Sequence, residues 1–324
     1  MRISSKAFTL RTSAILLASW ACFAGVMAYA ADPATNPVTP AAPKVPGGVD
    51  LRPKLDVGKT FRFRMVLDSK EKQTLPQDPS DPAAKPETSD ASQQQDIVLK
   101  LTVKDSNAET GSTLELVYES LKMSVSNPAL GDITFDSTKA VDKNDPAAAA
   151  VAEMLSSIVG TTLTISMDKD GNVTNVSGPV AATGGGAADA FTGKDVIGGL
   201  VGQIFTLKKG SPIVRVGETW TNDSVMNAAW GKTRVTTTNT LRSHSGGKAL
   251  IAIKGAVNME PSSPGQAISI TIKDSKLEGN ATWNTEDGML DAMNVSQTMS
   301  IDITSPMGPT QTTSNKKTTV TRMK

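Results

Sequence analysis

Residues 61–67 read Phe-Arg-Phe-Arg-Met-Val-Leu, so apolar side chains recur at every second position. A period of two places Phe61, Phe63, Met65 and Leu67 on one face of an extended strand and the arginines on the other. The same alternation returns in runs that begin near residues 97, 114, 121, 163, 251, 268 and 295. Antiparallel sheets with one buried and one solvated face show this pattern. The sequence therefore predicts a mainly β protein.

Two segments have helical spacing instead. Asp145-Pro146 supplies a cap residue and a first-turn proline before an apolar stretch that ends at Gly160. Thr192 to Asp195 resembles a capping box and precedes a second apolar stretch that ends at Phe205. Both stretches are amphipathic or largely apolar, so we expect two short helices packed on the concave face of a curved sheet or open barrel.

A weak internal repeat suggests how the strands are organised. Residues 55–61 (Leu-Asp-Val-Gly-Lys-Thr-Phe) align with residues 214–220 (Val-Arg-Val-Gly-Glu-Thr-Trp), and each half later contains an Asp-Gly turn. We therefore predict one β-rich domain, residues 55–324, built of two related antiparallel β-meanders. The meanders would span about 55–178 and 212–324, joined by a Gly-rich helical connector at 179–211.

The N-terminal thirty residues have the features of a signal peptide. A basic beginning is followed by an apolar run at 14–27 and by Ala28-Tyr29-Ala30, which predicts cleavage between Ala30 and Ala31. The alternative is that this segment stays attached as an anchor. Residues 31–54 are rich in Ala and Pro and are expected to be an extended tether. The sequence therefore predicts a bacterial protein exported to the periplasm or secreted, with no transmembrane span in the mature chain.

Composition excludes several classes of function. The 324 residues include 33 basic and 32 acidic side chains, one His and one Cys. Three basic residues and Cys22 precede residue 31, so the exported chain would hold 30 basic and 32 acidic groups and no cysteine. Disulfides and thiolate chemistry are thereby excluded. Without a basic excess, nucleic acid is not expected as a partner.

Three short groups of residues resemble metal-binding, catalytic or phosphate-binding motifs, but each has a simpler interpretation. Asp168, Asp170 and Asn172 have calcium-loop spacing, yet no Glu follows at the twelfth position, so a tight turn is favoured. Ser243-His244-Ser245 precedes a Gly-Gly hairpin tip and reads as an exposed loop rather than a catalytic pair. The glycines at 184–186 lack the rest of a phosphate loop. We therefore expect no catalytic, cofactor or metal site.

Two motifs carry a resemblance to a known family. They are the Val216-Gly217-Glu218-Thr219-Trp220 segment, of V-G-x-T-W form, and the stretch Leu163–Val173, which reads L-T-I-S-M-D-K-D-G-N-V. Together they resemble an uncharacterised family of exported, β-rich bacterial proteins of about 300 residues. The resemblance implies an envelope protein and assigns no catalytic residues. We interpret Val216, Gly217, Thr219 and Trp220 as a structural motif, with Trp220 as a core anchor.

The function expected from these observations is non-enzymatic binding or assembly in the cell envelope. A curved sheet that holds apolar helices would admit a lipid-like ligand if it opened. Methionines are adaptable lining residues, although ordinary core packing also explains them; they include Met123, Met154, Met167, Met259, Met293 and Met299. Trp230 and Trp283 would either line a cavity or pack in the core. Two alternatives remain: a hydrolase that uses paired carboxylates on an envelope polymer, and a purely structural scaffold.

Overall fold

The computed structural model describes residues 47–74, 87–128, 131–140, 146–179, 189–208, 211–228, 231–260, 269–305 and 308–324. The strands are β1 (Val49–Asp50), β2 (Thr60–Thr74), β3 (Thr88–Asn107), β4 (Gly111–Asn127), β5 (Gly131–Asp136), β6 (Thr162–Met167), β7 (Val173–Ser177), β8 (Ile213–Val214), β9 (Thr219–Ala228), β10 (Gly231–Ser245), β11 (Lys248–Glu260), β12 (Ser269–Asn284), β13 (Met289–Ser305) and β14 (Gly308–Met323). The helices are α3 (Pro146–Ser156), α4 (Asp189–Thr192) and α5 (Lys194–Phe205). This mainly β content confirms the predicted fold class.

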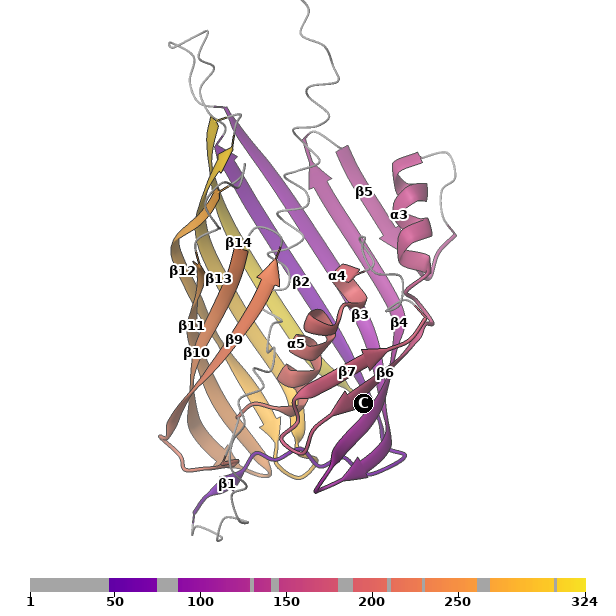
Figure 1. The fold of residues 1–324 in the computed structure, drawn as a ribbon, viewed down its shortest axis with the longest axis vertical. Coiled ribbons are helices and arrows are strands. Elements are labelled where there is room, and N and C mark those ends of the chain that lie inside the picture. The colour runs from indigo at the N-terminus through magenta and orange to yellow at the C-terminus, as the bar shows by residue number, and fades with distance from the viewer. Residues whose placement is uncertain are drawn as a thin grey trace, which may run out of the picture.

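One antiparallel sheet contains all the long strands. Its order is β7-β6-β4-β3-β2-β14-β13-β12-β11-β10-β9, with β5 also paired to β4. The C-terminal strand β14 lies beside β2, so it joins the two halves of the chain into a single sheet. The edge strands β7 and β9 are not paired with each other, and the curved sheet stays open (Figure 1). The connector between β7 and β9 must therefore run from one edge to the other, across the concavity.

The predicted alternation corresponds to the buried face of this sheet. Phe61, Phe63, Met65 and Leu67 are all buried, whereas Arg62 and Arg64 between them are exposed. Neighbouring strands place buried residues opposite these, because residues directly across an antiparallel pair share a face. The apolar core therefore lines the concave side and continues over both halves.

Two glycines on the concave face mark close contact between strands. A Cβ added at Gly279 of β12 would lie 2.2 Å from the carbonyl oxygen of Asn294 in β13. At Gly255 of β11 the corresponding distance to the carbonyl oxygen of Thr236 in β10 is 2.4 Å. Strand glycines of this kind allow a bend that a side chain would obstruct. At both positions the neighbouring strand lies too close for a side chain.

The helices lie near the predicted positions: α3 begins at Pro146 as predicted, whereas the predicted cap of α5 differs. α3 contacts β5, and Leu155 and the following Ile158 are completely buried in the core. α4 and α5 lie inside the curve of the sheet (Figure 1). The capping box predicted at Thr192–Asp195 is wrong, because the N-cap of α5 is Gly193 and no side chain caps it. Thr192 is itself buried at the end of α4, so its side chain belongs to the interior.

The expected tether at 31–54 includes residues that are part of the folded domain. Val49 and Asp50 form β1, which pairs with β8, and the Leu51 N–H donates to the Pro212 carbonyl at 3.0 Å. Val49 and Leu51 are buried. The folded domain thus begins several residues before the predicted boundary at residue 55. Prolines around these residues obscured the short apolar signal.

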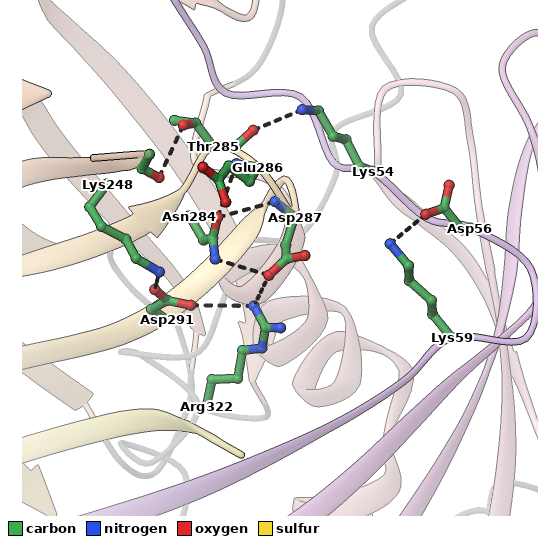
Figure 2. Close-up of polar contacts among 11 residues, drawn as sticks. Lys54, Asp56, Lys59, Lys248, Asn284, Thr285, Glu286, Asp287, Asp291 and Arg322 are labelled. Carbon is green, nitrogen blue, oxygen red and sulfur yellow. Dashed lines mark hydrogen bonds and ion pairs between the residues drawn. The ribbon is translucent and has the colours of Figure 1, made fainter. Parts of the chain in front are cut away.

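A polar network stabilises the end of the sheet where the β12–β13 turn meets the C-terminal strand (Figure 2). Arg322 Nη1 donates to Asp287 Oδ2 at 2.6 Å and to Asp291 Oδ1 at 3.3 Å, while Lys248 also pairs with Asp291. The hydrogen bond from Arg322 lowers the pKa of Asp287, although partial burial opposes the shift. The Arg322 guanidinium also lies 5.6 Å from the ring centroid of Phe61. The contact between Arg322 and Phe61 therefore joins the second half of the chain to the first at this end of the sheet.

Candidate ligand-binding site

Helix α5 fills part of the concavity and is apolar on nearly every side. Its buried residues are Ile197, Leu200, Val201, Ile204 and Phe205. The twelve residues also include three glycines, each of which costs about 1 kcal/mol of helix propensity relative to Ala. Packing against the sheet, rather than intrinsic propensity, therefore holds this helix in place.

The C-terminal end of α5 is attached to β9 through a single carbonyl group. Trp220 Nε1 and Asn222 Nδ2 both donate to the Leu207 carbonyl oxygen, at 2.8 Å and 2.9 Å. Thr206 Oγ1 donates to the Gly171 carbonyl at 3.0 Å, which joins the same end to the turn before β7. The Trp220 side chain of the V-G-x-T-W motif thus lies in the core and fixes the helix.

The remaining residues of the V-G-x-T-W motif form a turn around Gly217, and a similar turn occurs around Gly58 in the first half of the chain. Gly217 adopts φ +88° and its N–H donates to the Leu241 carbonyl at 2.8 Å. Gly58 adopts φ +85° and donates to the Val103 carbonyl at 2.9 Å. A positive φ suits glycine because it has no Cβ. Val216 is exposed at the turn, and Thr219 Oγ1 lies 3.1 Å from Thr240 Oγ1.

At the other end of the connector, α4 is attached to β4. The Tyr118 hydroxyl donates to the Phe191 carbonyl oxygen in a short hydrogen bond. Burial of Tyr118 raises its pKa, so the phenol remains protonated and able to donate. The α4–α5 connector is therefore fixed at both ends to opposite parts of the sheet.

A pocket of about 30 Å³ lies beside the C-terminal end of α5. Its lining is mostly aliphatic on the sheet side, with amide and hydroxyl groups near β9: Gln203, Leu207, Asn222, Ser224, Val235, Thr237, Ile253, Leu277, Met293 and Val295. This space holds about two water molecules. A larger apolar ligand would enter only if α5 moved away from the sheet.

A cluster of buried polar side chains continues from this pocket along the concave face. Lys316 of β14 lies directly opposite Ser69 of β2 and Gln297 of β13, and Gln297 in turn lies opposite the pocket residue Leu277. We call the following residues the Lys316 cluster; all are at most 6% exposed: Ser69, Gln95, Gln297, Ser314, Lys316 and Thr318.

Each member of the Lys316 cluster has a side-chain atom without a hydrogen-bond partner within the described residues. The unpaired atoms include Lys316 Nζ and the carbonyl oxygens of Gln95 and Gln297. Most buried polar groups in proteins are paired, and each unpaired one costs about 1–3 kcal/mol, more when it is charged. A cluster of six at one place is the arrangement expected of a site for a polar ligand group.

The sequence did not reveal the Lys316 cluster. On β14 the inward positions are Ser314, Lys316, Thr318 and Val320, three of them polar. Hydrophobic alternation is the only local signal for an inward face, and here it is absent. Only the pairing of β14 with β2 and β13 shows which way these side chains point.

Several sequence-derived candidates have structural roles. The Asp168 carboxylate accepts from the backbone N–H groups of Asp170 and Asn172, as in a tight turn. His244 is exposed and its Nε2 lies 3.2 Å from Thr285 Oγ1. Trp283 is completely buried. Among the methionines suggested as lining, Met293 lines the pocket, while Met123, Met167 and Met299 are buried in the core and Met259 packs against it.

Other candidates lie outside the described residues. They are Ala30 and Ala31 at the predicted cleavage site, the glycines at 184–186, Trp230 and the side chain of Met154. Within the described ranges, no three His, Cys, Asp or Glu residues are grouped so as to hold a metal ion. Among the helices of those ranges, none is long and apolar enough to cross a membrane.

Comparisons with known proteins give a partial family match and no function. Residues 109–196 match a family described as "Family of unknown function (DUF6263)". This match is consistent with the resemblance to an uncharacterised family; it includes Leu163–Val173 and ends before Val216–Trp220. No curated protein sequence matches the chain.

Solved structures with partial similarity have low scores. An outer membrane channel from Pseudomonas putida F1 is 10% identical, with a TM-score of 0.23 over 84% of this chain and 97% of that chain. DynF from the dynemicin biosynthesis pathway of Micromonospora chersina is 9% identical, with a TM-score of 0.19 over 90% of each chain. OccK7 (OpdD) of Pseudomonas aeruginosa is 7% identical, with a TM-score of 0.21 over 82% of this chain and 99% of that chain. TM-scores this low assign neither fold nor function.

Proposed function

We propose that this protein is a non-enzymatic binding protein of the bacterial envelope that holds a lipid-like ligand between α5 and the concave sheet. The observation that carries the proposal is the aliphatic pocket beside an apolar helix of low intrinsic stability. Because packing rather than intrinsic propensity holds this helix, a ligand whose apolar chain replaces that packing compensates for displacing α5 and covers the apolar surface beneath it. Export is proposed from the signal-peptide features of residues 1–30.

The two alternatives have less support in the fold. A carboxylate hydrolase requires two acidic side chains facing each other in a cleft, but the buried polar residues in the described ranges include no Asp or Glu. A structural scaffold does not need a pocket or a buried lysine. It is favoured if cross-linking in cells captures stable envelope partners while extraction finds no small ligand.

The direct test is native mass spectrometry, with lipid extraction, of the full chain purified from the envelope. A co-purifying amphiphile is the expected result. Protein that carries no ligand, and that also takes up no added fatty acid or fatty alcohol, contradicts the proposal.

A disulfide lock tests whether α5 must move. A Cβ at position 198 in α5 would lie 3.7 Å from the Val173 Cβ in β7, which is the usual spacing for a disulfide. We expect Gly198→Cys/Val173→Cys, made with Cys22→Ser, to lose ligand uptake when oxidised and recover it when reduced. The two single-cysteine variants are the matched controls. Equal uptake by the oxidised and reduced double variant would contradict movement of α5 away from β7.

A further inference from the structure

Lys316 is the one charged side chain among the buried residues of the described ranges. Its position is 5% exposed, and neither Glu71 nor another described acidic residue forms an ion pair with it. Glu71 is the acidic residue nearest in register on the concave face, since it lies opposite Ser314, and it is only partly buried. Asp68, opposite Lys317, lies on the other face. An unpaired buried cation is costly unless something neutralises it. The interior therefore has a positive site that the described residues do not satisfy.

The neighbours of Lys316 are suited to an anionic group. Ser69 and Gln297 lie on either side of it, and Ser314 and Thr318 lie two residues away on the same strand face. Gln95 lies opposite Leu67, which is the inward residue next to Ser69 along β2. The hydroxyl groups of Ser69, Ser314 and Thr318 donate hydrogen bonds to carboxylate or phosphate oxygens, and the Lys316 ammonium adds three more donors. Together they form an anion site with a single positive charge.

The anion site is continuous with the apolar pocket. Val295, which lines the pocket, precedes Gln297 by two residues on β13, so both side chains point to the concave face. Directly opposite residues have Cβ atoms about 5 Å apart, so Lys316 lies one strand from Gln297. An amphiphile whose chain takes the place of α5 beside the pocket would have its head group within reach of Lys316.

Resting on the function proposed above, we propose that the ligand is a long-chain amphiphile with an anionic head group, a carboxylate or a phosphate ester, bound by Lys316. The hydroxyl groups of Ser69, Ser314 and Thr318 complete the hydrogen bonding to its oxygens. Neutral amphiphiles of the same chain length leave the lysine unpaired and bind more weakly. The apolar surface beneath α5 provides affinity for the chain, and Lys316 provides selectivity for the head group.

The test compares three probes of equal chain length, hexadecanoic acid, hexadecyl phosphate and hexadecanol, by competition against a fluorescent fatty acid on the full chain. We expect at least one acidic probe to bind tenfold or more tightly than hexadecanol. Lys316→Met should remove that preference, keep hexadecanol affinity unchanged, and raise the Tm of ligand-free protein because it removes the unpaired cation. The stronger acidic probe identifies the head group.

The matched control is Lys317→Met, which removes the same charge from the exposed face of β14 and should retain the preference. Equal binding of all three probes to the unaltered protein, or a preference that persists in Lys316→Met, overturns the role of Lys316 while leaving the proposed function standing. Binding of none overturns both. If Lys316→Met does not fold, Ser69→Ala, which removes the hydroxyl directly opposite Lys316, is measured in the same way and should weaken only the acidic probes.

Discussion

At the scale of single residues, the position of Gly279 allows a specific prediction about how closely β12 packs against β13. A methyl group at this position would lie 2.2 Å from the Asn294 carbonyl oxygen and 2.8 Å from the Val295 Cα, both backbone atoms of β13. Backbone cannot yield as a flexible side chain does, so we expect Gly279→Ala to destabilise the protein by about 2–3 kcal/mol. Urea unfolding followed by circular dichroism measures this.

Gly198→Ala is the matched control, because the nearest atom to its added Cβ is the Val173 Cβ at an ordinary 3.7 Å. In a helix this change should be neutral or stabilising by up to about 1 kcal/mol. Equal destabilisation by the two variants would show that strand contact at Gly279 is not the cause.

Asp287 makes a prediction about acid stability. Its pKa is lowered in the folded protein, first by the hydrogen bond from Arg322. The stabilisation is therefore fully present above the unfolded value near 3.9 and is lost as the pH falls through the folded value. We expect Asp287→Asn to cost about 1 kcal/mol at pH 6 and less at pH 3, since both partners are partly exposed.

Unfolding in urea at the two pH values tests this expectation. Asp56→Asn serves as control, because its ion pair with Lys59 is exposed and should contribute little (Figure 2). A cost for Asp287→Asn that grows toward acid pH would reverse the expected sign and reject the assignment.

At the scale of elements, Trp220 connects a sequence motif to the position of a helix. Trp220→Phe retains a buried ring but removes the donor to the Leu207 carbonyl. The lost hydrogen bond and the smaller ring should together cost about 1–3 kcal/mol. Amide exchange should accelerate in α5 before it does in the central strands, because the helix depends on this attachment.

Hydrogen exchange read by mass spectrometry localises the effect. Thr219→Val is the neighbouring control: its hydroxyl contact with Thr240 is exposed and its loss should change stability by less than about 0.5 kcal/mol. Uniform acceleration across the whole sheet in Trp220→Phe would mean that the residue supports the fold in general and not α5 in particular.

Elements could be predicted wherever burial imposed a period on the sequence. Phe61 to Leu67 identified β2 because one face of the strand is buried and the other is solvated. The capping box predicted before α5 is wrong, because Thr192 is polar yet belongs to the interior and Gly193 takes the N-cap position. The Lys316 cluster could not be predicted, since an inward lysine resembles an outward one until the neighbouring strands are known.

At the scale of the whole molecule, the order of the strands in the sheet could not be predicted from local sequence patterns. β14 is the last strand in the chain, yet it pairs with β2 from Met323↔Arg62 to Gln311↔Thr74. Contacts so distant in sequence leave no local periodicity, and closing them carries a large entropic cost during folding. Two halves that resemble each other in sequence are thereby merged into one sheet and one core.

This merging predicts that the two meanders unfold together. Trp220 and Trp283 report on the second half by fluorescence, while amide exchange in β3 and β4 reports on the first. Because the β14–β2 pairing and the Arg322 network join the halves, we expect both signals to change at one urea concentration. Removing residues 308–324 deletes the joining strand and leaves long edges on β2 and β13, so the shortened chain should aggregate or fail to fold. Two separate transitions in the full chain, or a soluble folded first half after the truncation, would show that each meander is an independent domain connected by β14 without depending on it.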